Sequence, residues 1–269
     1  MTSSGRARRS GGRAPAAFAV PAALAVAFLA LPLLGLLERA PWRQLGGELA
    51  SPQVLVALRL SLVCSVGALA LAVVVGVPLA VLLARVDFPG RSLVRALVIL
   101  PMVLPPTVGG VALLLAFGRR GLAGQWLDRA LGVSLPFTTA GAMLAEAFVA
   151  MPFLVLSVEA GLRAMERRYE DAAATLGAGR WTTFRRVTLP LVAPSLGAGA
   201  ALCWARALGE FGATITFAGN LPGATQTMPL AVYLALETDV NGAIALSLVL
   251  LLVSLVVLVA LRDRWVSAL

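Results

Sequence analysis

The sequence predicts an all-α, polytopic membrane protein with about six transmembrane helices. Of its 269 residues, 59% are hydrophobic and only 13% are charged, whereas about a quarter of the residues in a soluble domain are charged. Apolar runs long enough to cross a hydrocarbon core of about 30 Å recur along the whole chain. The net charge of +9 comes with arginine as the only basic residue type, because lysine and histidine are absent.

These absences exclude several functions. A P-loop needs a lysine, so any ATP that drives this protein must be hydrolysed by another chain. No lysine can form a Schiff base, and no histidine can relay protons or bind a metal. Cys64 and Cys203 lie inside apolar runs without metal-ligand or redox spacing, which is typical of small packing residues. We therefore expect no catalytic residue, no metal site and no cofactor.

The N-terminal end combines a polar tail with a first apolar run. Residues 1–15 are rich in Gly, Ser and Arg and are expected to form a disordered cytoplasmic tail, and residues 16–37 are apolar. A signal peptide is the alternative, but its apolar region is usually about 7 to 15 residues long. We interpret the run as a retained first span, so that residues 16–269 form one transmembrane domain.

Five further apolar runs follow, at residues 54–84, 94–117, 139–162, 188–211 and 241–261. An even number of spans places both termini on one side of the membrane. If that side is the cytoplasm, five of the 22 arginines lie outside, and these are Arg39, Arg43, Arg119, Arg120 and Arg129. Two more, Arg59 and Arg206, lie within spans. The other fifteen are inside, as the positive-inside rule requires of a multi-pass protein of the cytoplasmic membrane. Because topology accounts for the charge, no nucleic-acid partner is expected.

The third run contains three prolines that should bend its helix. Pro101, Pro105 and Pro106 each lack an amide proton, so carbonyl groups one turn earlier lose their partners. Such a kink can serve as a pivot or line a gate. An inert bend remains the alternative, since prolines are common in membrane helices.

A charged insert separates the fourth and fifth runs, on the predicted cytoplasmic side. Its central stretch, YEDAAATLGAGRWTTFRRVTLPLVAP, spans residues 169–194. The pattern predicts one helix that ends at Gly177 and a second that begins near Trp181. This turn contains three large apolar residues between arginines, namely Leu176, Trp181 and Phe184. Such a turn either lies against lipid headgroups or enters a groove on a soluble partner.

The fifth run contains charges at membrane depth, where each costs about 2.5 to 3.5 kcal/mol on insertion scales. Arg206 and Glu210 are spaced i, i+4 on one helix face and can neutralise each other. The GEFG stretch from Gly209 to Gly212 interrupts the helix directly after them. A broken helix requires cover by protein or by a water-filled path, so the pair either braces a gate or fixes helix packing.

Five other positions in the spans have simpler interpretations. The small residues Ser195, Gly199 and Cys203 form a stripe that allows close helix packing, within the chain or between two copies. Glu146 lacks a local partner and is expected to face an interhelical cavity. Glu159 is expected to pair with Arg163.

The insert resembles the cytoplasmic loop of the membrane subunits of ABC importers. That family has E-A-A-x-x-x-G followed nine residues later by I-x-L-P, and the pattern is met by Asp171, Ala172, Ala173, Gly177, Val187, Leu189 and Pro190. Asp171 replaces Glu and Val187 replaces Ile, while Glu170 next to Asp171 can supply the longer carboxylate. Residues 204–237 and the double-proline stretch at 100–121 resemble the molybdate permease branch, and the latter is shared with the sulfate branch. The likeness covers about residues 50–260.

The resemblance implies that the insert docks in a cleft of an ATPase subunit and that rigid helices transmit its motion to an outer gate. The expected coupling residues are Glu170, Asp171, Ala172, Ala173, Leu176, Gly177, Trp181, Phe184, Arg185 and Pro190. The expected residues of the path or gate are Pro105, Pro106, Arg206, Gly209, Glu210 and Gly212.

The resemblance also implies partners: two ATPase subunits, a second copy of this chain and an extracytoplasmic oxyanion-binding protein. Thr227, Met228 and Pro229 begin a short external helix that is expected to contact the binding protein. The implied cargo is molybdate, and sulfate, thiosulfate or tungstate are the alternatives. An ion-coupled secondary transporter is a rival of another class, but it leaves the insert without a use. A structural or receptor-like membrane protein explains neither the helix break nor the prolines.

Overall fold

The computed structural model describes residues 16–43 and 45–266, so the expected tail at residues 1–15 lies outside the described residues. The described part is built from helices joined by short connections, with no strand among its residues. In chain order the helices are α1 (Ala16–Glu38), α2 (Leu45–Leu49), α3 (Pro52–Arg85), α4 (Arg91–Val103), α5 (Pro106–Phe117), α6 (Gly124–Leu131), α7 (Thr139–Ala164), α8 (Arg168–Thr175), α9 (Arg180–Thr183), the π-helix η1 (Phe184–Thr188), α10 (Leu189–Leu208), α11 (Gly212–Ala218), α12 (Met228–Thr238) and α13 (Val240–Val266).

Five of the six predicted runs coincide with one long helix each: α1, α3, α7, α10 and α13. Four continuous helical segments in the described chain are long and apolar enough to cross a membrane: Phe18–Glu38, Pro52–Arg85, Thr139–Ala164 and Arg180–Leu208. Two of the shorter apolar helices are α5 and α12. The protein is therefore an all-α membrane protein with several membrane-spanning helices.

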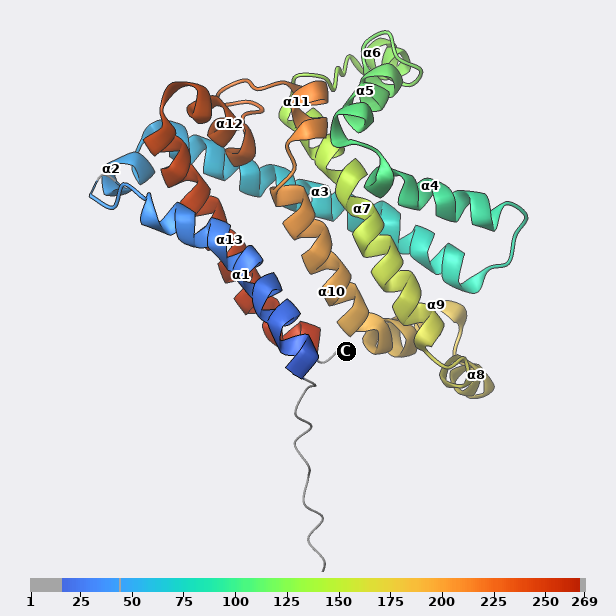
Figure 1. Cartoon of the computed structure of the whole chain (residues 1–269). Coiled ribbons are helices and arrows are strands. Elements are labelled where there is room, and N and C mark those ends of the chain that lie inside the picture. The colour runs from blue at the N-terminus through green and yellow to red at the C-terminus, as the bar shows by residue number, and fades with distance from the viewer. Residues whose placement is uncertain (1–15, 44, 267–269) are drawn as a thin grey trace, which may run out of the picture.

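The prediction of one kinked helix over residues 94–117 was wrong. The segment forms two separate helices, α4 and α5, that run in different directions (Figure 1). Leu104 and Pro105 have ψ angles of 137° and 132°, which are extended rather than helical. The cause is the proline pair, because a residue that precedes proline is disfavoured in the helical region, and both Leu104 and Pro105 precede one.

Helix α7 is the centre of the fold, with α3 and α10 packed along it. Small residues make the α7–α10 contact close: a Cβ added at Gly199 would lie 2.7 Å from the Cβ of Ser157. The Ser157 hydroxyl donates to the carbonyl of Ser195 at 2.8 Å. The predicted stripe at Ser195, Gly199 and Cys203 thus serves helix packing within the chain, and Cys203 and Cys64 are both fully buried.

The molecule has two distinct ends. The start of α1, the end of α13 and the α8–α9 region lie at one end, which is the lower end in Figure 1 and is called the α8 end below. The opposite end, called the α11 end, contains α6, α11 and α12. Helix α1 lies at the periphery beside α13 and leaves most of its apolar side chains exposed, as expected of a helix that faces lipid.

Candidate functional site

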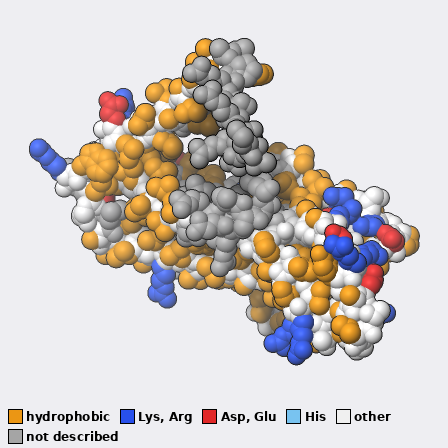
Figure 2. Space-filling model, turned by 90° about the horizontal axis from the view of Figure 1, so that it is seen from below, with side chains coloured by type: hydrophobic (Ala, Val, Ile, Leu, Met, Phe, Trp, Pro, Cys, Tyr) orange, Lys and Arg blue, Asp and Glu red, His pale blue; other side chains and the backbone are white. Residues whose placement is uncertain are grey.

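The α8–α9 insert (residues 165–188) exposes large apolar side chains at the α8 end. Leu176 is 88% exposed and Trp181 is 72% exposed. The ring of Phe184 stacks on that of Trp181, with centroids 5.7 Å apart. Figure 2 views the molecule from the α8 end and shows charged side chains among hydrophobic ones towards the side where α8 and α9 lie. Exposed apolar groups rimmed by charge are typical of an interaction surface.

Gly177 determines the turn that presents this surface. Its φ of +81° lies in the left-handed region that only glycine adopts without strain. The Gly177 amide donates to the carbonyl of Ala174, and the Ala178 amide donates to that of Ala173. These two bonds form a Schellman motif, which ends α8 and satisfies its last carbonyls. The predicted helix end at Gly177 is confirmed, and Ala173 contributes to it through its backbone.

The two acidic residues of α8 face different surroundings. Asp171 is exposed and has no ion pair among the described residues, whereas the Glu170 side chain is only 25% exposed. The Glu170 carboxylate pairs with Arg85 at the end of α3 at 3.2 Å. The same oxygen accepts a 2.7 Å hydrogen bond from the Thr188 hydroxyl. Of the two carboxylates, Asp171 is therefore the one available to a partner.

A π-helical turn joins α9 to α10. The Leu189 amide donates to the carbonyl of Phe184, five residues earlier, instead of the usual four. Pro190 explains the change, because it has no amide proton to offer the carbonyl of Arg186. Arg185 in this turn is exposed, and so is Ala172 in α8.

The second candidate site lies at the break between α10 and α11, where the predicted interruption is confirmed. The Arg206 guanidinium pairs with the Glu210 carboxylate at 2.5 Å, and Glu210 is only 1% exposed. The other Glu210 oxygen accepts a 2.9 Å hydrogen bond from the Ala213 amide in the first turn of α11. The i, i+4 pair was predicted from the sequence, whereas the bond to α11 was not.

A cavity of about 310 Å³ opens beside this pair. It is lined by Pro106, Thr107, Arg206, Gly209, Glu210, Phe211 and Gly212. Five of the six predicted gate residues therefore line one cavity, and the sixth, Pro105, directly precedes α5 next to it. A Cβ added at Gly212 would lie only 2.7 Å from the Cβ of Pro106, so α5 and α11 begin in close contact.

The other predicted acidic residues lie in α7. The expected Glu159–Arg163 pair is confirmed at 2.7 Å, and Arg95 of α4 also approaches Glu159 at 3.6 Å. Glu146 is 1% exposed, and its Oε2 atom has no hydrogen-bond partner among the described residues.

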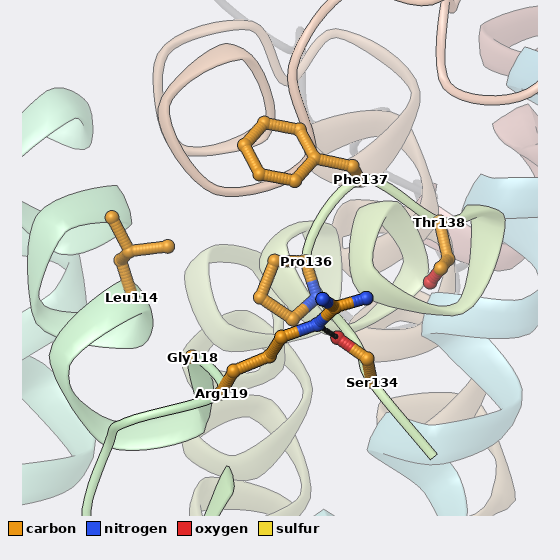
Figure 3. Close-up of a pocket in the computed structure, with 7 residues that line it drawn as sticks. All are labelled: Leu114, Gly118, Arg119, Ser134, Pro136, Phe137 and Thr138. Carbon is orange, nitrogen blue, oxygen red and sulfur yellow. Dashed lines mark hydrogen bonds between the residues drawn. The ribbon is translucent and has the colours of Figure 1, made fainter. Parts of the chain in front are cut away.

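A further cavity, of about 550 Å³, lies at the α11 end and was not predicted (Figure 3). The Arg119 Nε donates to the Ser134 hydroxyl at 3.1 Å, while Leu114 and Phe137 line the walls. Phe137 has a φ of +60°, which is uncommon for a residue other than glycine. The sequence feature that could have indicated this cavity is Arg119, one of the few arginines predicted outside the cytoplasm. The predicted short helix at Met228 is present as α12, with Pro229 in its first turn.

Comparisons with known proteins agree with this architecture. A family model described as "Binding-protein-dependent transport system inner membrane component" matches residues 76–268. The chain is 44% identical over 245 residues to the "Molybdenum transport system permease protein ModB" of Mycobacterium tuberculosis, covering 91% of this chain and 92% of that protein.

Two other similarities extend the comparison. The chain is 38% identical over 239 residues to the "Sulfate transport system permease protein CysT" of Escherichia coli, covering 87% of this chain and 86% of that protein. The fold is similar to the crystal structure of a bacterial ABC transporter involved in the import of the acidic polysaccharide alginate, with a TM-score of 0.73 and 19% identity. That match covers 92% of this chain and 93% of the other.

A match over most of the chain, high identity to two named permeases and a shared fold lead to one conclusion: the chain belongs to the family of binding-protein-dependent transport system inner membrane components.

Proposed function

We propose that the chain is the permease subunit of an ABC importer that carries molybdate across the cytoplasmic membrane into the cell. The supporting observation is its 44% identity to the molybdenum transport permease over 91% of the chain. Sulfate is the second candidate cargo, supported by the 38% identity to the sulfate permease. Both anions are tetrahedral dianions, so a short path past one arginine offers little basis for discrimination between them.

The ATPase-coupling surface is the exposed side of the α8–α9 insert. Leu176, Trp181 and Phe184 are apolar anchors that enter a cleft of the ATPase subunit, and central aromatic anchors contribute most of the binding energy at such interfaces. Asp171 and Arg185 at the rim form ion pairs with the partner. ATP is hydrolysed by the partner and not by this chain.

The gate is the cavity at the α10–α11 break. Arg206 lines this cavity with a half-buried guanidinium, whose charge attracts a passing oxyanion and is offset by Glu210 when the path is empty. Pro106 and Gly212 supply the contact that closes it. The Pro105–Pro106 break lets α5 move as a unit separate from α4.

The proposed assembly contains two copies of this chain, two ATPase subunits and one oxyanion-binding protein on the outer side. Two copies are needed because the closing ATPase pair moves two inserts. Residues 16–269 form one transmembrane domain, and both termini and the α8 end face the cytoplasm with residues 1–15 as a tail. The binding protein meets the α11 end, where α12 lies.

Uptake in reconstituted vesicles tests the proposed cargo. The permease and its ATPase are placed in proteoliposomes with the loaded binding protein outside and ATP inside. We expect accumulation of radiolabelled molybdate, competition by tungstate and weak uptake of sulfate. A P-loop lysine variant of the ATPase is the control and abolishes uptake. Uptake without any ATPase contradicts the proposal, and preferential uptake of sulfate would make sulfate the cargo instead of molybdate.

Orientation is tested with a single accessible thiol. Because Cys64 and Cys203 are buried, a Leu176→Cys variant places one exposed cysteine on the insert. In intact cells an impermeant maleimide should fail to label it until the membrane is opened. Labelling in intact cells places the insert outside and refutes the coupling role.

A further inference from the structure

The Glu170 carboxylate of α8 contacts the last turn of α3, which is distant in the sequence, and the residue directly before α10. Its Oε1 atom lies 3.2 Å from the Arg85 guanidinium in the last turn of α3. The same atom accepts the Thr188 hydroxyl, which immediately precedes α10, at 2.7 Å. Helix α8 otherwise packs chiefly on its neighbours α9 and η1. One side chain thus fixes α8 both to the end of α3 and to the start of α10.

The surroundings of this carboxylate favour a lasting internal contact over a partner contact. The Arg85 side chain is 16% exposed, and Thr188 is 4% exposed. Glu170 is the one acidic group within 4.0 Å of Arg85 among the described residues. Arg163 of α7 also donates to the carbonyl of Leu83, so the final turn of α3 is held from two sides. A half-buried guanidinium that loses its one carboxylate is strongly disfavoured.

Helices α3 and α10 both lead from this point to the α11 end. In α3, Ser61 lies 24 residues before Arg85, or about 36 Å at 1.5 Å per residue. The Ser61 hydroxyl accepts a 2.7 Å hydrogen bond from the Met228 amide at the start of α12. In α10, Arg206 of the gate lies 18 residues after Thr188, or about 27 Å. The Trp204 indole of α10 donates to the Ser65 hydroxyl of α3 at 2.8 Å, which ties the two helices together.

We infer that Glu170 is a positioning residue that attaches α8 to the end of α3 through Arg85 and to the start of α10 through Thr188, and that this joint transmits movement of α8 to the gate. The inference rests on the proposed function, because it assumes that an ATPase moves the insert. It separates two tasks within the insert: Asp171, Leu176 and Trp181 bind the partner, and Glu170 transmits the displacement. Loss of the joint should uncouple ATP hydrolysis from transport and leave the ATPase bound.

The test uses the full permease–ATPase complex in proteoliposomes and compares uptake with ATP hydrolysed. For Glu170→Gln we expect hydrolysis within about twofold of wild type and uptake per ATP lowered about tenfold, within the range of typical coupling energies. Thr188→Val should give a smaller loss, because it removes one hydrogen bond and leaves the ion pair. The double variant Arg85→Glu with Glu170→Arg restores the pair with opposite polarity and should recover most of the coupling.

The matched control is Glu166→Gln, which breaks the exposed Glu166–Arg168 pair of the same insert at 2.6 Å. This pair joins residues two apart in the sequence and attaches no distant helix, so coupling should not change. Co-purification of the ATPase with each variant is the second measurement. Loss of the ATPase from Glu170→Gln places Glu170 in the docking contact and overturns the inference, as does wild-type coupling in that variant.

Failure of the proposed function has a different signature. If the wild-type complex imports sulfate instead of molybdate, the variants are compared with sulfate and the inference stands or falls as before. If the wild-type complex imports neither anion, the proposed function fails, and retention of the ATPase by Glu170→Gln still decides whether Glu170 belongs to the docking surface.

Discussion

Replacing Gly212 with alanine should separate the starts of α5 and α11, whose contact closes the proposed gate. The new Cβ would lie 2.7 Å from the Cβ of Pro106 and 3.3 Å from the amide nitrogen of Thr107. An ordinary contact begins at 3.4 Å, so the two helix starts must separate by about 0.7 Å. The ring of Pro106 is rigid and belongs to the first residue of α5, so the backbone must move.

The magnitude follows from this overpacking. One extra carbon in a packed contact costs about 1–3 kcal/mol. A penalty of that size lowers the population of the state in which α5 and α11 touch by roughly 5- to 150-fold. We expect at least about a fivefold loss of ATP-driven uptake and a lower unfolding temperature of the purified permease.

Two glycines serve as matched controls. An alanine at Gly209 lines the same cavity and meets only the Ala205 carbonyl at an ordinary 3.7 Å, so the unfolding temperature should stay at the wild-type value. An alanine at Gly35 of α1 meets nothing within 4 Å, so uptake should also be unchanged. If Gly212→Ala imports anion at the wild-type rate and melts at the wild-type temperature, the close contact of α5 and α11 has no role in gating.

The remaining predictions concern the charge pair and the insert. Arg206→Ala leaves the Glu210 carboxylate buried without its cation, which should cost about 3–5 kcal/mol in stability by thermal unfolding and should lower uptake. Combining Arg206→Ala with Glu210→Gln should recover stability and leave uptake low. Full recovery of uptake in the double variant would mean that the pair serves only helix packing. Gly177→Ala forces alanine to a φ of +81° at a cost of about 1–2 kcal/mol, and binding of the ATPase in a pull-down should be weaker. The control Gly179→Ala, at a φ of −67°, should bind the ATPase as wild type does. Trp181→Ala should weaken binding of the ATPase about 30-fold or more by titration, since a central aromatic anchor contributes at least about 2 kcal/mol, and an unchanged affinity argues against docking through this face.

The features that could be predicted from the sequence are those determined by local rules. Hydrophobic length located five of the long helices, and the i, i+4 spacing located the Arg206–Glu210 pair. The Gly177 turn also followed from local chemistry, because glycine after a helix is typical of its end. By the same logic, the break at Leu104 and Pro105 should have been expected, because two residues in succession precede a proline. The length of the apolar run over residues 94–117 favours a single helix instead.

The features that escaped prediction depend on residues distant in the sequence. Pro106 and Gly212 meet only because α5 and α11 pack together, and nothing in either segment specifies the other. Glu170 and Asp171 are adjacent and chemically alike. The positions of Arg85, 85 residues earlier, and of Thr188 determine which of them faces inward.

The carboxylate of Glu210 has two duties at once, since one oxygen balances the guanidinium of Arg206 and the other holds the first turn of α11. A substitution of Glu210 therefore affects both the charge beside Arg206 and the hydrogen bond that holds the start of α11. A replacement without an acceptor oxygen would release the backbone that the carboxylate anchors, whereas glutamine keeps one acceptor and loses only the charge. Glutamine is therefore the substitution at residue 210 that can change the charge of this cavity while the start of α11 stays in place.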